Sequence, residues 1–333
     1  MSNIKYVQAV PRIRSIENKL LDKAKIERLV DSASADEAFK ILQETSYGTL
    51  MGNLKRPEDY EILLSDELKR LYSFMYEIAP EKELIDVMSL RYDYHNIKVL
   101  LKGEALGKDF TDLLIPVGTI KISDLKTYVT TESYSDLCPL MREGIEKARE
   151  AFREEKDPQK IDIILDNYMY RDMHLKATAM NEPYLTKFIQ SNIDLINLRT
   201  LLRVKKQNKP RKFLEETLLE GGKLEREGLL ELLSVSPENI ISKLQNSDYS
   251  DVIKFGIEEY IQSKSLNVFE KASDNFMMSL IKDAKYVSFG LEPLLAYIFA
   301  KENEIRLVRI IMVGKLNNID AEVIRERLRD IYV

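Results

Sequence analysis

The sequence predicts an all-α protein, and three observations support this fold class. Apolar residues recur at helical spacing along most of the chain, as Ile13, Ile16 and Leu20 do near the start. Glycine (12) and proline (10) are scarce among 333 residues, whereas sheet-rich folds need many turns. Strand-like alternation is rare. Its best candidate, Ile115–Ile122, is short and is interrupted by Gly118.

Prolines mark the boundaries of the expected helices. They fall between periodic segments, where a proline is tolerated in the first turn of a helix. The prolines at these positions are Pro57, Pro80, Pro158, Pro183, Pro210, Pro237 and Pro293. Ser236 precedes Pro237, and this order predicts a serine N-cap.

Composition sets limits on the class of protein. A chain of 333 residues with 44% hydrophobic and 32% charged residues is globular, with room for one large domain or up to three small ones. A net charge of -5 argues against a general polyanion binder. The single cysteine, Cys138, excludes an internal disulfide and a zinc site built on several thiolates, which fits a reduced, cytosolic setting. We expect neither a secretory signal nor a membrane span.

Two kinds of segment recur along the chain. The tyrosine segment ends a helix with small polar residues and a tyrosine, and its copies contain Tyr47, Tyr134 and Tyr249. The acidic-helix segment has an acid, a base five residues later and an aliphatic run. Its copies are DYHNIKVLLK from Asp93, DLINLRTLLR from Asp194 and, more loosely, EIRLVRIIMV from Glu304.

A third element, the aliphatic pair, is two aliphatic residues five positions apart, and it is weak by itself. Its copies are Leu21/Ile26, Ile120/Leu125, Leu224/Leu229 and Ile319/Ile324. The repeat spacing favours three similar helical bundles over a stacked superhelix. We expect helical units at 1–87, 88–187 and 188–300, with 301–333 packing back towards the first unit and closing a ring of three.

The search for catalytic chemistry is mostly negative. The chain has no phosphate-loop, dinucleotide-binding, HExxH or CxxC pattern. Its two histidines, His95 and His174, are read as general bases or as packing and surface residues, and the second reading is favoured. Carboxylate pairs are abundant and none stands out. A hydrolase with an unrecognised site therefore has no positive support.

The helix that contains Asp194 combines apolar residues around its circumference with charged ones. Isolated buried charges cost several kcal/mol, so these groups form ion pairs or face a wet cavity. Two interpretations stay open: ion pairs between neighbouring helices, or a polar cavity bordered by the three acidic-helix segments. The candidate residues for such a cavity, and for binding a partner, are Lys98, Lys102, Arg199, Arg203, Arg306 and Arg309.

Arg199–Lys212 contains seven bases and no acids. It is read as a solvated helix end or as a contact for an acidic protein surface, lipid headgroups or nucleic acid. Nucleic acid is the weakest of these, because the run lacks interleaved aromatic residues. An RNA-binding helical protein remains one alternative, and a generic helical scaffold is the chief one.

Four segments of the chain are similar to those of a known family. They are RYDYHNIKVLLKGEALG (Arg91–Gly107), SNIDLINLRTLLR (Ser191–Arg203), LLEGGKL (Leu218–Leu224) and FGLEPLLAYIFAKENEIRLVRIIMVGKLN (Phe289–Asn317). Together they resemble the C subunit of V/A-type rotary ATPases, a family that includes the eukaryotic d subunit (AC39-like). No single motif is specific, but their order, spacing and threefold repetition make the match strong. The similarity runs from about Tyr6 to Val333.

The resemblance implies three similar helical domains around a pseudo-threefold axis in a funnel-shaped molecule. It also implies a non-catalytic subunit that binds no nucleotide, cofactor, metal or small-molecule substrate. Such a subunit lies on the cytoplasmic side of the cell membrane, on the membrane rotor ring of proteolipid subunits. It receives the D and F subunits of the central stalk, and so links the stalk to the ring for ion transport or ATP synthesis.

Overall fold

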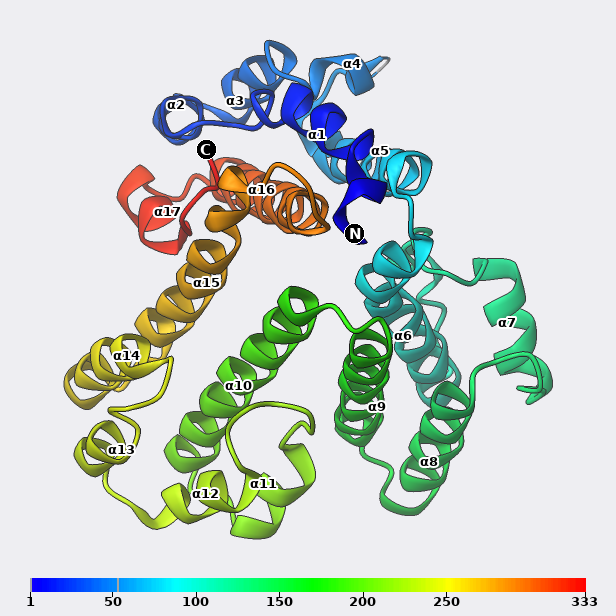
Figure 1. Ribbon diagram of the computed structural model, residues 1–333, viewed down its shortest axis with the longest axis vertical. Coiled ribbons are helices and arrows are strands. Elements are labelled where there is room, and N and C mark those ends of the chain that lie inside the picture. Colours follow the sequence, from blue (N-terminus) through cyan, green and yellow to red (C-terminus); the bar gives the residue numbers. More distant parts are fainter. Residues whose placement is uncertain (1, 53) are drawn as a thin grey trace. The chain divides into compact units, whose positions relative to one another are not determined.

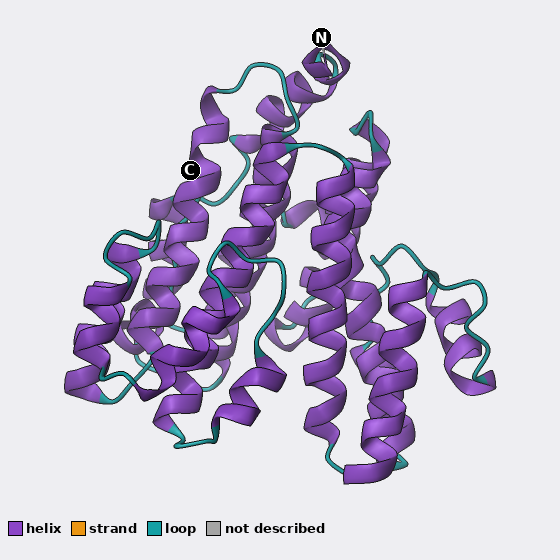
Figure 2. Ribbon diagram, turned by 60° about the horizontal axis from the view of Figure 1, so that its bottom comes forward, coloured by secondary structure: helices purple, strands orange, loops and turns teal. Residues whose placement is uncertain are grey.

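The computed structural model describes residues 2–52 and 54–333, and the ordered elements in this part of the chain are helices joined by loops (Figure 2). The predicted all-α class is confirmed. The strand candidate Ile115–Ile122 contains no strand and forms the loop that leads into α7 (Ile122–Thr131). The reason is local: the backbone N–H groups of Thr119 and Ile120 donate to the side chain of Asp93, so they are not available to a neighbouring strand.

The chain divides into two compact units. The terminal unit combines residues 1–85 and 274–333, and the central unit contains residues 86–273. The helices of the terminal unit are η1 (Ser2–Tyr6), α1 (Ala9–Glu17), α2 (Lys23–Asp31), α3 (Ala35–Gln43), α4 (Gly48–Met51), η2 (Pro57–Asp59), α5 (Tyr60–Ile78), η5 (Asp283–Tyr286), α16 (Glu292–Leu316) and α17 (Ala321–Arg327).

The central unit contains shorter helices as well as three long ones. They are η3 (Thr111–Leu113), α7, α8 (Pro139–Glu155), α9 (Pro158–Ala179), α10 (Pro183–Lys206), α11 (Arg211–Thr217), α12 (Arg226–Glu231), η4 (Leu232–Ser234), α13 (Pro237–Lys243) and α14 (Ser250–Ser263). Two further helices, α6 (Lys82–Leu106) and α15 (Asn267–Lys282), run from one unit into the other.

Helix starts follow the local chemistry that the sequence predicts. Pro158, Pro183, Pro237 and Pro293 each occupy one of the first two positions of a helix, where no intrahelical N–H is required. Ser236 is confirmed as the N-cap of α13, since its side chain accepts a hydrogen bond from the backbone N–H of the third helical residue.

The core of the terminal unit is built around α16. This helix packs against α1, α3 and α5, so the last quarter of the chain lies beside the first (Figure 1). Ile305, Val308 and Ile311 on α16 share one buried apolar cluster with Leu29 on α2 and Leu63 on α5. A helix that is apolar on most sides is stable only when neighbours cover it. The N-terminal helices and α16 therefore form one core together.

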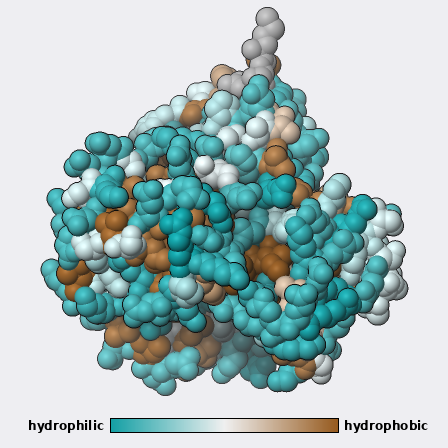
Figure 3. Space-filling view, turned by 90° about the horizontal axis from the view of Figure 1, so that it is seen from below, coloured by the Kyte–Doolittle hydropathy of each residue, from teal (hydrophilic) through white to brown (hydrophobic). Residues whose placement is uncertain are grey.

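In the central unit, α9 packs against α8 on one side and α10 on the other. The buried residues of α10 lie around most of its circumference, as its apolar pattern predicts. Charged residues are concentrated at the surface. The face of the molecule shown in Figure 3 is mostly hydrophilic, with small hydrophobic patches between polar side chains.

Candidate partner-binding site

Each acidic-helix segment holds a distant loop through its carboxylate. Asp93 on α6 accepts hydrogen bonds from the backbone N–H groups of Thr119 (2.9 Å) and Ile120 (3.0 Å) and from the Thr119 hydroxyl (2.7 Å). Asp194 on α10 accepts from the backbone N–H groups of Lys223 and Leu224, both at 3.0 Å. We call each such arrangement a carboxylate clasp.

The third clasp lies in the terminal unit. Glu304 on α16 accepts a 2.5 Å hydrogen bond from the backbone N–H of Leu21. The three aliphatic donors, Ile120, Leu224 and Leu21, are each the first residue of an aliphatic pair. The acidic-helix segments and the aliphatic pairs, which the sequence reveals only as separate repeats, are therefore joined by direct hydrogen bonds.

Two asparagines complete the clasps of the central unit, and the sequence analysis missed them. The side-chain amide of Asn96 donates to the Ile115 carbonyl and accepts from the Ile115 N–H, both at 2.8 Å. Asn197 makes the same pair of bonds with Leu219, at 2.9 and 2.8 Å. The available signal is an asparagine three residues after the aspartate in both DYHN and DLIN. The Glu304 segment has a leucine at that position.

The tyrosine segments occupy different environments. Tyr249 donates a 2.7 Å hydrogen bond to the Asp194 carboxylate. The Tyr47 ring lies 4.9 Å from the Lys301 ammonium, next to the third clasp. The Tyr134 ring faces Arg149 instead of a clasp carboxylate. In that clasp the Thr119 hydroxyl donates to Asp93, in the place that the Tyr249 hydroxyl takes at Asp194. The tyrosine therefore belongs to two of the three clasps.

A glycine lets the loop of each central clasp approach the carboxylate. A Cβ atom on Gly222 would lie 2.1 Å from an oxygen of Asp194, and one on Gly118 would lie 2.1 Å from an oxygen of Asp93. No such atom fits at this distance. The glycine is therefore required by the close approach of loop and carboxylate.

Gly222→Ala is expected to lower the free energy of unfolding by about 1–3 kcal/mol, because the new methyl group displaces Asp194 from buried donors. Gly228→Ala is the matched control. Its Cβ would meet open space within helix α12, and alanine favours a helix over glycine by roughly 0.5–1 kcal/mol. Urea denaturation of both variants checks this, and equal stability of the two would contradict the clasp geometry.

Three of the six predicted partner-binding residues form ion pairs within the central unit. Lys98 and Lys102 on α6 contact Asp166 (2.7 Å) and Asp162 (2.5 Å) on α9. Arg203 on α10 pairs with Glu270 on α15. These contacts match the first of the two open interpretations, ion pairs between neighbouring helices.

Arg199 and Arg203 also line a polar groove of about 440 Å³. The groove lies along α9 and α10, and residues of α11 contribute to it. Asp162 and Asp166 line its other wall, whereas Lys98 and Lys102 are not among its lining residues. The central unit thus has a groove with acids along one helix and arginines along the next.

Tyr170 on α9 lies in the same groove. Desolvation and the charge of Asp166 raise its pKa to about 12, while Arg91 and Arg199 act in the opposite direction. The phenol is therefore neutral at physiological pH, and the groove presents it as a hydrogen-bonding group beside the arginines.

The two remaining candidates lie on the exposed side of α16 in the terminal unit. Arg309 makes a bidentate contact with Glu61, at 2.8 and 3.0 Å, and Arg306 lies 3.6 Å from Asp274. Exposed pairs of this kind contribute at most about 1 kcal/mol to stability. Binding of a partner by any of the six residues stays a prediction.

His95 and Cys138 have ordinary surroundings. His95 contacts the Leu113 carbonyl at 2.9 Å, and burial raises the pKa of the Cys138 thiol, which disfavours a reactive thiolate. No group of three or more His, Cys, Asp or Glu side chains in residues 2–52 and 54–333 is arranged to hold a metal ion. Within the same residues, no helix has the length and apolar character of a membrane span.

Comparison with known proteins decides the family. The model of the ATP synthase (C/AC39) subunit family matches residues 9–327. The chain belongs to this family. It is 30% identical to the C subunit of the V-type sodium ATPase of Enterococcus hirae, over 99% of both chains. It is also 30% identical to the C subunit of the A-type ATP synthase of Methanocaldococcus jannaschii, over 97% of this chain and 85% of that one.

Among the other relatives is the C subunit of the A-type ATP synthase of Methanobrevibacter smithii, 28% identical over 93% of this chain and 84% of that one. The matched span of the C/AC39 family model includes all three clasp carboxylates and all six candidate bases. The resemblance expected from the four sequence segments is confirmed.

Proposed function

We propose that this chain is a non-catalytic coupling subunit of a V/A-type rotary ATPase, which links the soluble central stalk to the membrane rotor ring. The observation that carries the proposal is the similarity of this chain to the C subunit of a V-type sodium ATPase, which extends over almost the whole of both chains. Similarity to the C subunits of A-type ATP synthases, over most of their length, supports the same role. The complex uses the subunit for ATP-driven ion transport or for ATP synthesis.

The proposed architecture is three helical domains around a pseudo-threefold axis in a funnel-shaped molecule. The three carboxylate clasps support it, because each joins a long helix of 24 or 25 residues to the start of an aliphatic pair. The domains are proposed at 1–87, 88–187 and 188–300, with 301–333 returning to the first of them. In the terminal unit, α16 packs against helices from the start of the chain, which fits this return.

The proposed partners are the proteolipid subunits of the rotor ring and the D and F subunits of the central stalk. The chain acts on the cytoplasmic side of the cell membrane, attached through the ring and with no span of its own. A part that transmits torque resists shear best when it has broad interfaces on two sides. Charged residues in such interfaces set register and orientation more than affinity.

We assign the groove with Arg199 and Arg203 to the stalk. Its acids lie on α9 and its arginines on α10, so a helical stalk end with complementary charges would be held in one orientation. The other four bases, Lys98, Lys102, Arg306 and Arg309, are also proposed as partner contacts.

Affinity capture of the tagged chain from mildly solubilised native membranes tests the proposed role. Mass spectrometry is expected to identify the small proteolipid ring protein together with the D and F subunits. Recovery of soluble partners alone, with no ring protein at comparable amounts, would reject the coupling role and favour a generic helical scaffold.

Arg199→Glu combined with Arg203→Glu is expected to weaken stalk binding at least tenfold, because two charges in the groove change sign. The matched control is Lys243→Glu with Lys254→Glu, a reversal of equal size at exposed positions on α13 and α14. Binding of purified stalk subunits is measured by calorimetry, and circular dichroism verifies that both variants are folded. If both variants bound the stalk subunits with equal affinity, the assignment of Arg199 and Arg203 to the stalk site would be wrong.

A further inference from the structure

The terminal unit contains a pocket that shares no lining residue with the groove assigned to the stalk. It has a volume of about 410 Å³, within the usual range for sites of small molecules. Its lining comes from segments far apart in the chain: Ile16 on α1, Leu71 and Phe74 on α5, and Tyr297 on α16. These side chains give the pocket a mainly apolar wall, which favours a ligand with a hydrocarbon or aromatic body.

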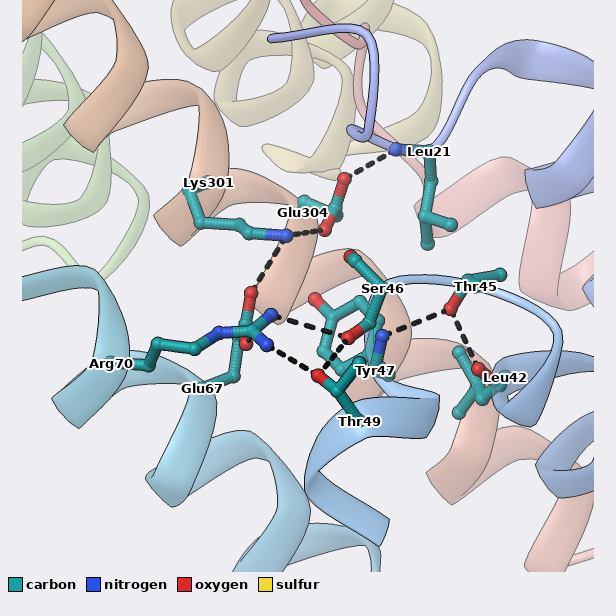
Figure 4. A network of polar contacts seen from close by, with 10 residues as sticks. All are labelled: Leu21, Leu42, Thr45, Ser46, Tyr47, Thr49, Glu67, Arg70, Lys301 and Glu304. Atoms are coloured by element: carbon teal, nitrogen blue, oxygen red, sulfur yellow. Dashed lines mark hydrogen bonds and ion pairs between the residues drawn. The ribbon is translucent and has the colours of Figure 1, made fainter. Parts of the chain in front are cut away.

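A network of ion pairs, drawn in Figure 4, contributes Glu67, Arg70 and Lys301 to the lining of the pocket. Lys301 lies 2.8 Å from Glu67 and 2.6 Å from Glu304, and Arg70 lies 2.5 Å from the second oxygen of Glu67. The two positive charges of this network equal its two negative charges in number. Lys19, which also lines the pocket, therefore adds one positive charge without a matching acid in the network.

One charged group at the pocket is accessible to a ligand. Lys19 is exposed, so its ammonium can reach a ligand at the entrance. In contrast, Thr49 and Glu67 are engaged by Arg70. An exposed ammonium beside an apolar wall suits an anionic head group.

We propose that this pocket binds a small amphiphilic anion, with its carboxylate or phosphate at Lys19 and its apolar body against Ile16, Leu71 and Phe74. The anion offsets the positive charge of Lys19. The ligand is either a free organic anion or the head and upper chain of an anionic lipid, since both present the same chemistry.

Calorimetry of the full chain with octanoate, octanol and octylamine tests the proposal. Octanoate is expected to bind with one-to-one stoichiometry and at least tenfold more tightly than the neutral and cationic probes of equal length. Lys19→Glu is expected to weaken octanoate binding at least tenfold, whereas Lys23→Glu, an exposed reversal four residues away, is expected to change it less than twofold. Ile16→Trp fills the apolar end and is expected to abolish binding.

Sedimentation with phosphatidylglycerol vesicles distinguishes the two sources of the anion. Loss of vesicle binding in Lys19→Glu, but not in Lys23→Glu, identifies an anionic lipid. Saturable octanoate binding without vesicle binding identifies a free anion. Absence of saturable octanoate binding, equal binding of all three probes, or equal effects of the two lysine reversals would each overturn the proposal.

Discussion

Lys301→Met is expected to lower the free energy of unfolding by about 3–5 kcal/mol, because it removes the cation shared by two buried carboxylates. Glu67 keeps its contact with Arg70, but Glu304 is left without a cation. Lys301, Glu67 and Glu304 are 3%, 1% and 4% exposed. Burial alone would lower the pKa of Lys301, but the charges of Glu304 and Glu67 outweigh it and raise the pKa above its ordinary value. The ammonium is therefore charged throughout the neutral range, and the full effect is present at pH 7.

Arg309→Met on the same helix is the matched control. It removes an exposed ion pair with Glu61, which costs at most about 1 kcal/mol. Urea denaturation at neutral pH compares the two variants. Adding Glu304→Gln to Lys301→Met is expected to recover part of the loss, because the stranded charge is then gone while an acceptor for the Leu21 N–H remains. A loss for Lys301→Met as small as that for Arg309→Met would contradict the buried network.

Asp194→Ala is expected to cost about 3–5 kcal/mol, since three donors lose their acceptor: two backbone N–H groups and the Tyr249 hydroxyl. Asp194→Asn keeps one acceptor oxygen, so a smaller loss of about 1–3 kcal/mol is expected. Glu258→Ala on α14 is the control, because its side chain is exposed and such changes stay within about 0.5 kcal/mol.

Tyr249→Phe makes the test of this clasp specific. In the Asp194→Ala background the bond from the phenol to the carboxylate is already absent, so removing the hydroxyl is expected to cost less than in the native protein. The difference is a coupling energy of about 0.5–3 kcal/mol, measured by equilibrium denaturation of the four proteins of the cycle. Strict additivity would show that Tyr249 and Asp194 do not share the bond.

The sequence predicts the helices well because their determinants are local. The 3.6-residue period and the first-turn prolines act within one element, as the capping of α13 by Ser236 illustrates. The repeats are also visible in the sequence, but the hydrogen bonds between the acidic-helix segments and the aliphatic pairs are not. Asp93 and Ile120 lie 27 residues apart, and Glu304 and Leu21 lie 283 apart, so no local pattern pairs them.

The candidate site is predicted in part. The sequence identifies Arg199 and Arg203 as neighbours on one helix face, and both line the same groove. It does not reveal the acids that pair with Lys98 and Lys102, because these lie on another helix and 32% of the chain is charged. The pocket of the terminal unit is equally invisible, since tertiary packing brings its three walls together from remote segments.

Both ends of the chain form the terminal unit, and this has a consequence for biosynthesis. During translation, the first 85 residues emerge long before α16, the helix that covers their apolar faces. The central unit is continuous in sequence and is complete while the nascent chain still lacks its last 60 residues. Closing so long a loop is slow, so the N-terminal helices are the part of a nascent chain that a chaperone or protease meets unprotected. A ribosome that stops before α16 therefore releases a product without that core, and cellular quality control can distinguish it from the finished protein.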